Sequence, residues 1–252
     1  MLNLLTFPLL SSLLFLAVGA AFGSFGNVLI LRLSAGRSIL GRSGCPRCGK
    51  VLSASELVPV VSFLFLRGKC AGCSGKISWQ YPLVETGSAL LFLLALILRE
   101  FTFLPSIVLA LVLWLFFLVA VMDARQGAVS DALTFPLLLL SLLYAFFSPP
   151  FHIVAPLLGA GFFAFQWVLS KGKWVGSADI FIGAVMGFLL LDWRIVLLAL
   201  AASYIFGALV AAVLMLLKKK TRKDHLPFIP FLAGGTILML MWGYEVLNVL
   251  MS

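Results

Sequence analysis

The sequence predicts an all-α protein, a polytopic membrane helix bundle, and two observations lead to this prediction. Of its 252 residues, 63% are hydrophobic and only 11% are charged, and its mean hydropathy is +1.17. A water-soluble core cannot hold so many apolar residues. Apolar runs approaching the roughly 20 residues that cross a bilayer recur along the chain, except within residues 32–80. That exception predicts a small loop region outside the bilayer.

The apolar runs predict about eight transmembrane helices, although a count of seven stays open because the fourth and sixth runs are short. They lie near residues 5–31, 82–98, 101–122, 132–147, 151–169, 179–191, 195–217 and 228–250. By this division, residues 1–31 form the first transmembrane helix, residues 32–81 a cysteine-containing loop, and residues 82–252 a transmembrane core.

Basic residues predict the orientation, because cytoplasmic loops collect Lys and Arg. With eight spans, sixteen of the eighteen basic residues fall on one side, and only Arg99 and Arg194 fall on the other. We therefore expect the 32–81 loop to be cytoplasmic and both termini to be outside. This bias accounts for the formal net charge of +9. The net charge therefore gives no reason to expect a nucleic-acid partner. We expect the helices to be surrounded by the lipid bilayer.

The first apolar run predicts an uncleaved helix, since no basic segment precedes it as in a secretory signal. Within it, Gly19, Gly23 and Asn27 recur at four-residue spacing, which places them on one helix face. Small residues let membrane helices approach closely, and an amide there finds a partner across the interface. We expect this face to pack against another helix.

Four cysteines in the loop are spaced as metal ligands. Cys45-x2-Cys48 and Cys70-x2-Cys73 are separated by 21 residues, and pairs of this spacing supply four thiolates to a tetrahedral zinc ion. Two disulfides or unligated thiols are the alternatives, of which a reducing cytoplasm disfavours the first. Four protein ligands leave no open position for a substrate. The predicted zinc is therefore structural, and any catalysis must use other residues.

Carboxylates are the remaining candidates for chemistry, since an ionisable group at membrane depth is costly to keep. Asp123 ends the third span and Asp179 opens the sixth, so both are expected at the cytoplasmic edge of the membrane. Two such carboxylates can share one proton, with one activating water and the other protonating a departing amine. The same groups also suit a proton-coupled transporter, and these residues alone leave both functions open.

Two further acids have structural interpretations. Asp131 precedes an apolar helix, so we expect its side chain to cap that helix. Glu85 lies just inside the second span, where it would either make a buried hydrogen bond or attract the amine of a substrate. The remaining acids and both histidines are expected in solvated or structural roles. They are Glu56, Glu100, Asp192, Asp224, Glu245, His152 and His225.

Five blocks of the sequence carry a family resemblance. They are GSFGNVLILRLSAGRS (23–38), CPRCGKVLSASELVPVVSFLFLRGKCAGCSGKISWQYPLVE (45–85), MDARQGAVSDALTFP (122–136), VGSADIFIGAVMG (175–187) and LPFIPFLAGG (226–235). In content and order they resemble the motifs of the type IV prepilin peptidases, bifunctional aspartic membrane proteases related to the GxGD type. The blocks are spread over most of the chain.

The resemblance implies an enzyme of the bacterial inner membrane. It implies cleavage of the basic leader of type IV prepilins or pseudopilins on the cytoplasmic side, followed by N-methylation of the new N-terminus from S-adenosylmethionine. By position in the motifs, the catalytic aspartates map to Asp123 and Asp179. No residue is assigned to the methyl donor. The alternative from another class is a polytopic transporter or scaffold with a zinc-stabilised loop.

The sequence departs from the family pattern around the second aspartate. Where the family usually has G-x-G-D followed by x-K-L, this chain has Ala178 before Asp179 and Phe181 at the lysine position. Alanine is small enough to keep the backbone close, whereas phenylalanine removes a cation near the acid. Gly183 and Gly187 continue at four-residue spacing from Asp179, which predicts close approach to a neighbouring helix.

Overall fold

The computed structural model describes residues 2–148, 150–219 and 226–251, and these residues are helical with connecting turns and loops. They divide into two compact units, residues 1–114 and 115–252, which we describe separately. Lys220, Arg222 and Lys223 of the basic run, together with Asp224 and His225, lie outside the described residues.

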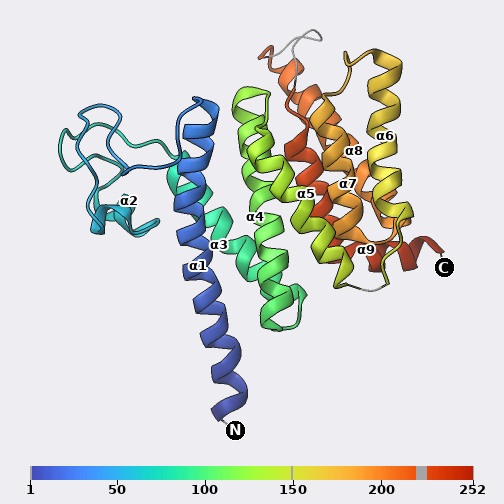
Figure 1. Ribbon diagram of the computed structural model, residues 1–252, viewed down its shortest axis with the longest axis horizontal. Helices are drawn as coiled ribbons and strands as arrows, with labels where there is room; N and C mark the ends of the chain where they lie inside the picture. The colour runs from blue at the N-terminus through green and yellow to red at the C-terminus, as the bar shows by residue number, and fades with distance from the viewer. Residues whose placement is uncertain (1, 149, 220–225, 252) are drawn as a thin grey trace. The chain divides into compact units, whose positions relative to one another are not determined.

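Unit 1 contains α1 (Leu2–Ser34), α3 (Gln80–Leu98) and the beginning of α4 (Phe103–Gln126). The loop between α1 and α3 carries a short 3₁₀ helix, η1 (Ser55–Leu57), and the short helix α2 (Val61–Phe65). Helices α1 and α3 pack side by side, with the loop extending from one end of the pair (Figure 1).

The predicted small-residue face of α1 is the face that packs on α3. A Cβ atom added to Gly19 would lie 2.8 Å from the Ala89 Cα, and one added to Gly23 would lie 2.5 Å from the Glu85 Cα. Real side-chain atoms do not approach backbone so closely, so this contact requires glycine on α1. The expectation that Gly19 and Gly23 lie at a helix interface is confirmed.

Asn27 joins the C-terminal part of α1 to the start of α3. It is buried, its Nδ2 donates to the Tyr81 carbonyl at 3.2 Å, and its Oδ1 accepts from Gln80 Nε2 at 3.1 Å. The amide has therefore found partners across the interface, as expected. These bonds hold α1 beside the first turn of α3 at a point about two turns before α1 ends at Ser34.

Unit 2 contains the end of α4 and the five helices that follow it. These are α5 (Asp131–Phe146), α6 (Val154–Ser170), α7 (Ser177–Leu190), α8 (Trp193–Leu216) and α9 (Ile229–Met251). Helix α7 contacts α5, α6, α8 and α9, so it lies at the centre of the unit (Figure 1). Its central position explains why its buried residues include Ile182, Val185 and Met186, each with no exposed surface.

Close backbone contact between α6 and α7 depends on glycine. A Cβ atom added to Gly183 would lie 2.3 Å from the Gly159 carbonyl oxygen, and one added to Gly187 would lie 2.2 Å from the Pro156 Cα. The two glycines predicted to let α7 approach a neighbour therefore do so. The neighbour is α6, and its own Gly159 faces Gly183.

The helices agree with the predicted spans. Five of them, α1, α3, α4, α8 and α9, are long and apolar enough to cross a membrane. Three shorter apolar helices, α5, α6 and α7, have 16, 17 and 14 residues. Together these eight helices fall on the eight predicted runs, so the prediction of an all-helical, multi-pass membrane protein is confirmed.

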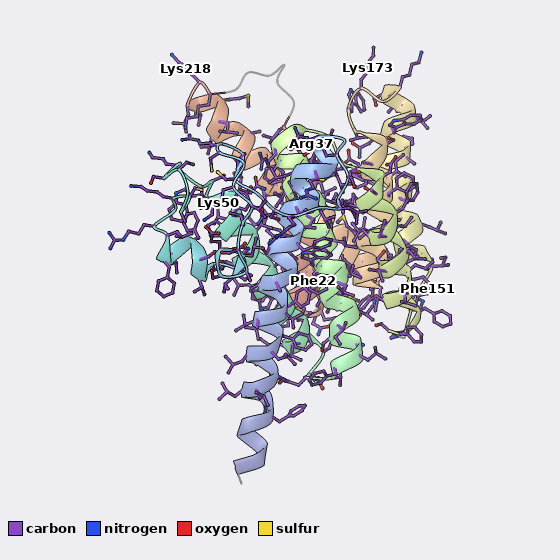
Figure 2. The ribbon with its side chains drawn as sticks, turned by 60° about the vertical axis from the view of Figure 1, so that its left-hand side comes forward. Phe22, Arg37, Lys50, Phe151, Lys173 and Lys218 are labelled. Carbon is purple, nitrogen blue, oxygen red and sulfur yellow. The ribbon has the colours of Figure 1, made fainter. Side chains whose placement is uncertain are left out.

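Positive charge marks one end of unit 2. Lys173 follows the end of α6 and Lys218 follows the end of α8, and both side chains project at the same end, whereas Phe151 lies at the opposite end (Figure 2). The C-terminal end of α4 and the N-terminal ends of α7 and α9 lie at the lysine end as well (Figure 1). Both predicted catalytic aspartates lie in these helix ends.

The α6–α7 contact gives a direct test of the packing in unit 2. Substituting Gly183→Leu should force the two helices apart and lower the thermal unfolding midpoint of the purified protein, since overpacking typically costs about 1–3 kcal/mol. Gly161→Leu is the matched control, because a Cβ at Gly161 of the same helix pair meets nothing within 4 Å. Equal midpoints for the two variants would contradict the contact.

Candidate active site and cysteine cluster

Asp123 lies in the last turn of α4 and binds the beginning of α9. Its side chain is buried, with 7% exposure, and its Oδ2 accepts a hydrogen bond from the Ile229 N–H at 3.0 Å. Ile229 is the first residue of α9, and the first N–H groups of a helix have no partner within the helix. A carboxylate is favourable there because the helix dipole places partial positive charge at the N-terminus. The Asp123 carboxylate therefore caps the N-terminus of α9.

Asp179 makes the equivalent interaction within its own helix. It is the third residue of α7 and 8% exposed, and its Oδ2 accepts a hydrogen bond from the Gly176 N–H at 2.9 Å. An acid at the third position that binds the N–H of the N-cap residue forms one half of a capping box. The other half needs a side-chain oxygen at the N-cap, which Gly176 lacks. The first turn of α7 thus fixes the Asp179 carboxylate.

The two carboxylates are held at one end of unit 2 and interact electrostatically with each other. Each binds a backbone N–H through Oδ2, the Phe228 N–H also interacts with the Asp123 carboxylate, and these contacts leave lone pairs unused on both carboxylates. Each carboxylate is therefore still available to water or to a substrate. Such a pair can carry out general acid and general base chemistry.

Aromatic and polar side chains line the same end of the unit. The Phe228 ring lies 4.8 Å from the Tyr204 ring and 6.4 Å from the Phe163 ring, and the Tyr204 hydroxyl donates to Gln166 Oε1 at 3.1 Å. The backbone N–H of Phe228 also interacts with Asp123, which brings this cluster to the acids. The sequence analysis did not single out Tyr204 or Gln166. Each could have been noticed as a polar residue within an otherwise apolar run.

The structure corrects the expected role of Asp131. The N-cap position of α5 is Ser130, whose side chain makes no capping hydrogen bond, and Asp131 is the first helical residue, with an exposed side chain. Its charge still complements the helix dipole from the first turn. The capping interpretation was wrong by one residue, because the extended backbone of Ser130, with φ −96° and ψ 131°, places the cap there.

The two departures from the family pattern lie in the same turn of α7 as Asp179. Ala178 is partly exposed and directly precedes Asp179. Phe181 is 39% exposed, and its ring lies 6.1 Å from that of Phe135 in α5. An aromatic contact between α7 and α5 therefore occupies the position at which the family usually has lysine.

The four cysteines meet in the loop of unit 1. The sulfurs of Cys45, Cys48, Cys70 and Cys73 all lie within 4.8 Å of one another, and none is in a disulfide. Cys45 Sγ and Cys73 Sγ are 3.9 Å apart. Zinc bonds to sulfur at about 2.3 Å, so tetrahedral thiolate ligands lie about 3.8 Å apart. The cluster has the spacing of a tetrahedral metal site.

Each cysteine pair lies in a turn with the same hydrogen bonds. Cys45 N–H donates to the Lys50 carbonyl at 2.9 Å, and Cys70 N–H donates to the Gly75 carbonyl at 2.9 Å. Isolated antiparallel bridges close the turns at Gly44–Val51 and Lys69–Lys76. The chain therefore builds the same turn twice, and each turn contributes two sulfurs.

Charge around the cluster is balanced locally. Lys50 Nζ lies 2.8 Å from Glu56 Oε1, and this contact together with the Ser53 N–H lowers the pKa of Glu56 to about 2. Backbone N–H groups of Cys48 and Arg47 lower the pKa of the Cys45 thiol to about 6. Desolvation and hydrogen bonds to the other cysteines instead raise the pKa of the Cys48 thiol to about 11, so within this pair the Cys45 sulfur favours the thiolate form that binds metal.

Glu85 makes the buried hydrogen bond that was one of its two expected roles. Its Oε2 accepts from the Val60 N–H at 2.7 Å. Val60 has φ +60° and ψ −48°, and the Val61 N–H donates across it to the Pro59 carbonyl at 2.5 Å. This is the rare form of the γ-turn, strained for a β-branched residue. Glu85 thus anchors a strained turn at the start of α2.

The comparisons with known proteins identify the family. Residues 17–99 match the bacterial peptidase A24 N-terminal domain, and residues 109–212 match the type IV leader peptidase family. The prepilin leader peptidase/N-methyltransferase of Bacillus subtilis (strain 168) is 33% identical over 94% of this chain and 96% of its own length. This chain belongs to the type IV leader peptidase family.

Further relatives in the family are also prepilin leader peptidase/N-methyltransferases. The prepilin leader peptidase/N-methyltransferase of Pseudomonas aeruginosa is 29% identical over 95% of this chain and 93% of its own length. That of Myxococcus xanthus (strain DK1622) is 37% identical over 83% of this chain and 64% of its own length. No solved structure matches the chain. Both aspartates fall within the segment matched to the leader peptidase family, and all four cysteines fall within the N-terminal match.

Proposed function

We propose that this chain cleaves the basic leader of type IV prepilins or pseudopilins, with Asp123 and Asp179 as the catalytic pair. The observation that carries this proposal is that both buried carboxylates lie in helix ends at the same end of unit 2, each with one oxygen held by a backbone N–H. The relatives over most of the chain are prepilin leader peptidase/N-methyltransferases, which supports the same reaction.

The geometry suits peptide hydrolysis by water. The ionised carboxylate takes a proton from water, which attacks the scissile carbonyl carbon. The protonated carboxyl donates its proton to the nitrogen as the C–N bond breaks, so proton and leaving group balance. The bonds from Ile229 to Asp123 and from Gly176 to Asp179 hold one oxygen of each acid, which orients the other toward the reacting atoms.

The orientation follows from the charges around the acids. The lysine-bearing ends of α6 and α8 lie at the same end of unit 2 as both aspartates (Figures 1 and 2). Because cytoplasmic segments collect Lys and Arg, this supports the proposal that the acids face the cytoplasmic side of the bacterial inner membrane; the basic residues of the 32–81 sequence support the same side for that loop, with both termini outside. Cleavage then takes place where a newly made prepilin carries its leader.

Methyl transfer is the second activity, which the relatives' description supports. The amine released by cleavage would take its methyl group from S-adenosylmethionine, the donor implied by the family resemblance: the N–C bond would form as the S–CH3 bond breaks, S-adenosylhomocysteine would leave, and the nitrogen would lose a proton. The amine is a product of the first reaction, so the two activities act in sequence on one N-terminus. The acids that hydrolyse the peptide have no necessary role in this second step.

Zinc is the metal that best suits the cysteine cluster. Four thiolates in tetrahedral spacing are the preferred ligands of structural zinc and leave no open position for catalysis. Cys45, Cys48, Cys70 and Cys73 would hold the ion and join the two halves of the 32–81 loop. We accordingly treat residues 32–81 as a separate zinc-stabilised part between the first helix and the transmembrane core.

Loss of either acid should abolish leader cleavage. Asp123→Asn and Asp179→Asn each remove one proton-transfer role, so each should slow cleavage of a prepilin in membranes by about a hundredfold or more. The double variant should be no slower than either single one, as expected for groups that act as a unit. Cleavage is followed by the change in prepilin mass, with the amount of each variant measured.

Asp131→Asn is the matched control for this experiment. Asp131 is exposed in the first turn of α5, so its variant should cleave at close to the normal rate. Full cleavage by either Asp123→Asn or Asp179→Asn would remove the proposed pair. Complete loss in Asp131→Asn at normal protein level would place Asp131 in the catalytic group.

Methylation should survive loss of the peptidase. Because hydrolysis and methyl transfer are different reactions, Asp179→Asn should still methylate a pilin whose N-terminal amine has been freed beforehand. Transfer of a labelled methyl group from S-adenosylmethionine measures this directly. If well-folded Asp179→Asn transfers no label while the unsubstituted chain does, the two sites overlap.

The cysteine cluster should bind about one zinc per chain in protein purified under reducing conditions. Cys45→Ser and Cys70→Ser each remove a ligand, so both should lose the metal and unfold at a lower temperature. Ser74→Ala changes the same turn without removing a ligand and should keep the metal. Elemental analysis showing no zinc in the unsubstituted protein would contradict the assignment.

A further inference from the structure

A pocket of about 410 Å³ lies in the loop of unit 1, beside α2, and neither proposed activity uses it. Phe63, Leu64 and Trp79 form apolar parts of its lining, and Arg67, Lys69 and Lys76 also line it. The ring centroids of Phe63 and Trp79 are 5.1 Å apart, which fixes the loop against the start of α3. One pocket therefore combines an aromatic wall with three cations.

Among the described residues, no acid forms an ion pair with the cations of this pocket. Lys69 and Lys76 face each other across an antiparallel bridge, an arrangement in which like charges destabilise the pairing. The sequence from residue 32 to residue 79 contains a single acid, Glu56, which is already bound to Lys50 at 2.8 Å. An anion between the lysines and Arg67 would remove this repulsion.

The cysteine thiolates do not account for these cations, because two other basic side chains cover the cysteine turns. A Cβ added to Gly72 would lie 2.9 Å from the Lys50 Cδ, and one added to Gly75 would lie 2.7 Å from the Arg47 Cδ. Lys50 and Arg47 therefore pack over the turns that hold the sulfurs. Arg67, Lys69 and Lys76 of the pocket are therefore available to bind an anion other than the cysteine thiolates.

The position of Trp79 indicates which anion is within reach. Trp79 is 70% exposed and directly precedes α3, a helix long and apolar enough to span the membrane. Tryptophan is enriched at the depth of the lipid headgroups. Nearby on α2, Leu64 and Phe65 are 65% and 83% exposed. The bonds of Asn27 hold α1 beside the start of α3, and Trp79 of the pocket directly precedes that start, next to two helices long and apolar enough to span a membrane.

We propose that this pocket binds the headgroup of an anionic phospholipid from the surrounding bilayer. The lipid phosphate lies among Arg67, Lys69 and Lys76, while Trp79 and the apolar side chains of α2 contact the upper acyl chains. Basic residues at this depth attract anionic lipids. Binding would hold the cysteine loop on the membrane surface, independently of whether the chain cleaves prepilins.

Native mass spectrometry of the full chain, titrated with phosphatidylglycerol or phosphatidylcholine in detergent, tests the proposal. The unsubstituted chain should retain phosphatidylglycerol preferentially. The triple variant Arg67→Gln, Lys69→Gln, Lys76→Gln should bind it about a hundredfold more weakly, since each basic residue near an anionic lipid strengthens binding about fivefold. Trp79→Ala should weaken lipid binding without affecting binding of soluble glycerol phosphate.

The control triple Lys171→Gln, Lys173→Gln, Lys218→Gln removes as much charge from exposed positions of unit 2 and should bind phosphatidylglycerol normally. Equal losses in the two triples would overturn the site in favour of general charge attraction. Equal retention of the two lipids, or full displacement of the lipid by soluble glycerol phosphate, would overturn it as well. If the pocket triple does not fold, its three single variants are measured, each with an expected loss of about fivefold.

Discussion

The hydrogen bond from the Ile229 N–H to Asp123 shows the constraint on which this structure depends. When a helix end is buried within the protein, as Ile229 at the start of α9 is, its first backbone N–H groups need protein partners. The first N–H groups of α9 have no partner in their own helix, and the Asp123 carboxylate supplies one at 3.0 Å. Asp179 meets the same need at the start of α7. Burying a carboxylate costs free energy, and the hydrogen bond that each acid accepts at a helix N-terminus offsets part of that cost. The same bond orients the carboxylate for proton transfer.

Hydrogen bonds from polar side chains also fix the chain in unit 1, where the loop between α1 and α3 begins and ends. Asn27 binds the first turn of α3, and Glu85 binds the N–H of the strained Val60. The guanidinium of Arg32 donates to the carbonyls of Ile39 and Leu40 at 2.9 and 2.7 Å. These interactions fix the base of the loop before any metal binds. The cysteine turns lie on this base, so a metal would join two turns that the backbone has already formed.

Features set by local spacing could be predicted from the sequence, whereas contacts between distant segments could not. The apolar runs give the helices, four-residue spacing gives the faces of Gly19 and Gly183, and the paired cysteines give their cluster. The bond from Asp123 to Ile229 joins residues 106 positions apart, and the Tyr204–Gln166 contact depends on how α6 and α8 pack. Asp131 was misassigned because the cap position depends on the backbone angles of Ser130, which residue type does not determine.

The intact mass of a prepilin produced together with this chain tests the central claim most directly. Cleavage and methylation change the mass independently, so one spectrum reports both reactions. The account predicts that the pilin loses its leader as a single discrete fragment and gains the mass of one methylene group. A prepilin that keeps its full mass beside a well-expressed, membrane-inserted chain, and does so for every prepilin and pseudopilin of the same bacterium, would contradict it.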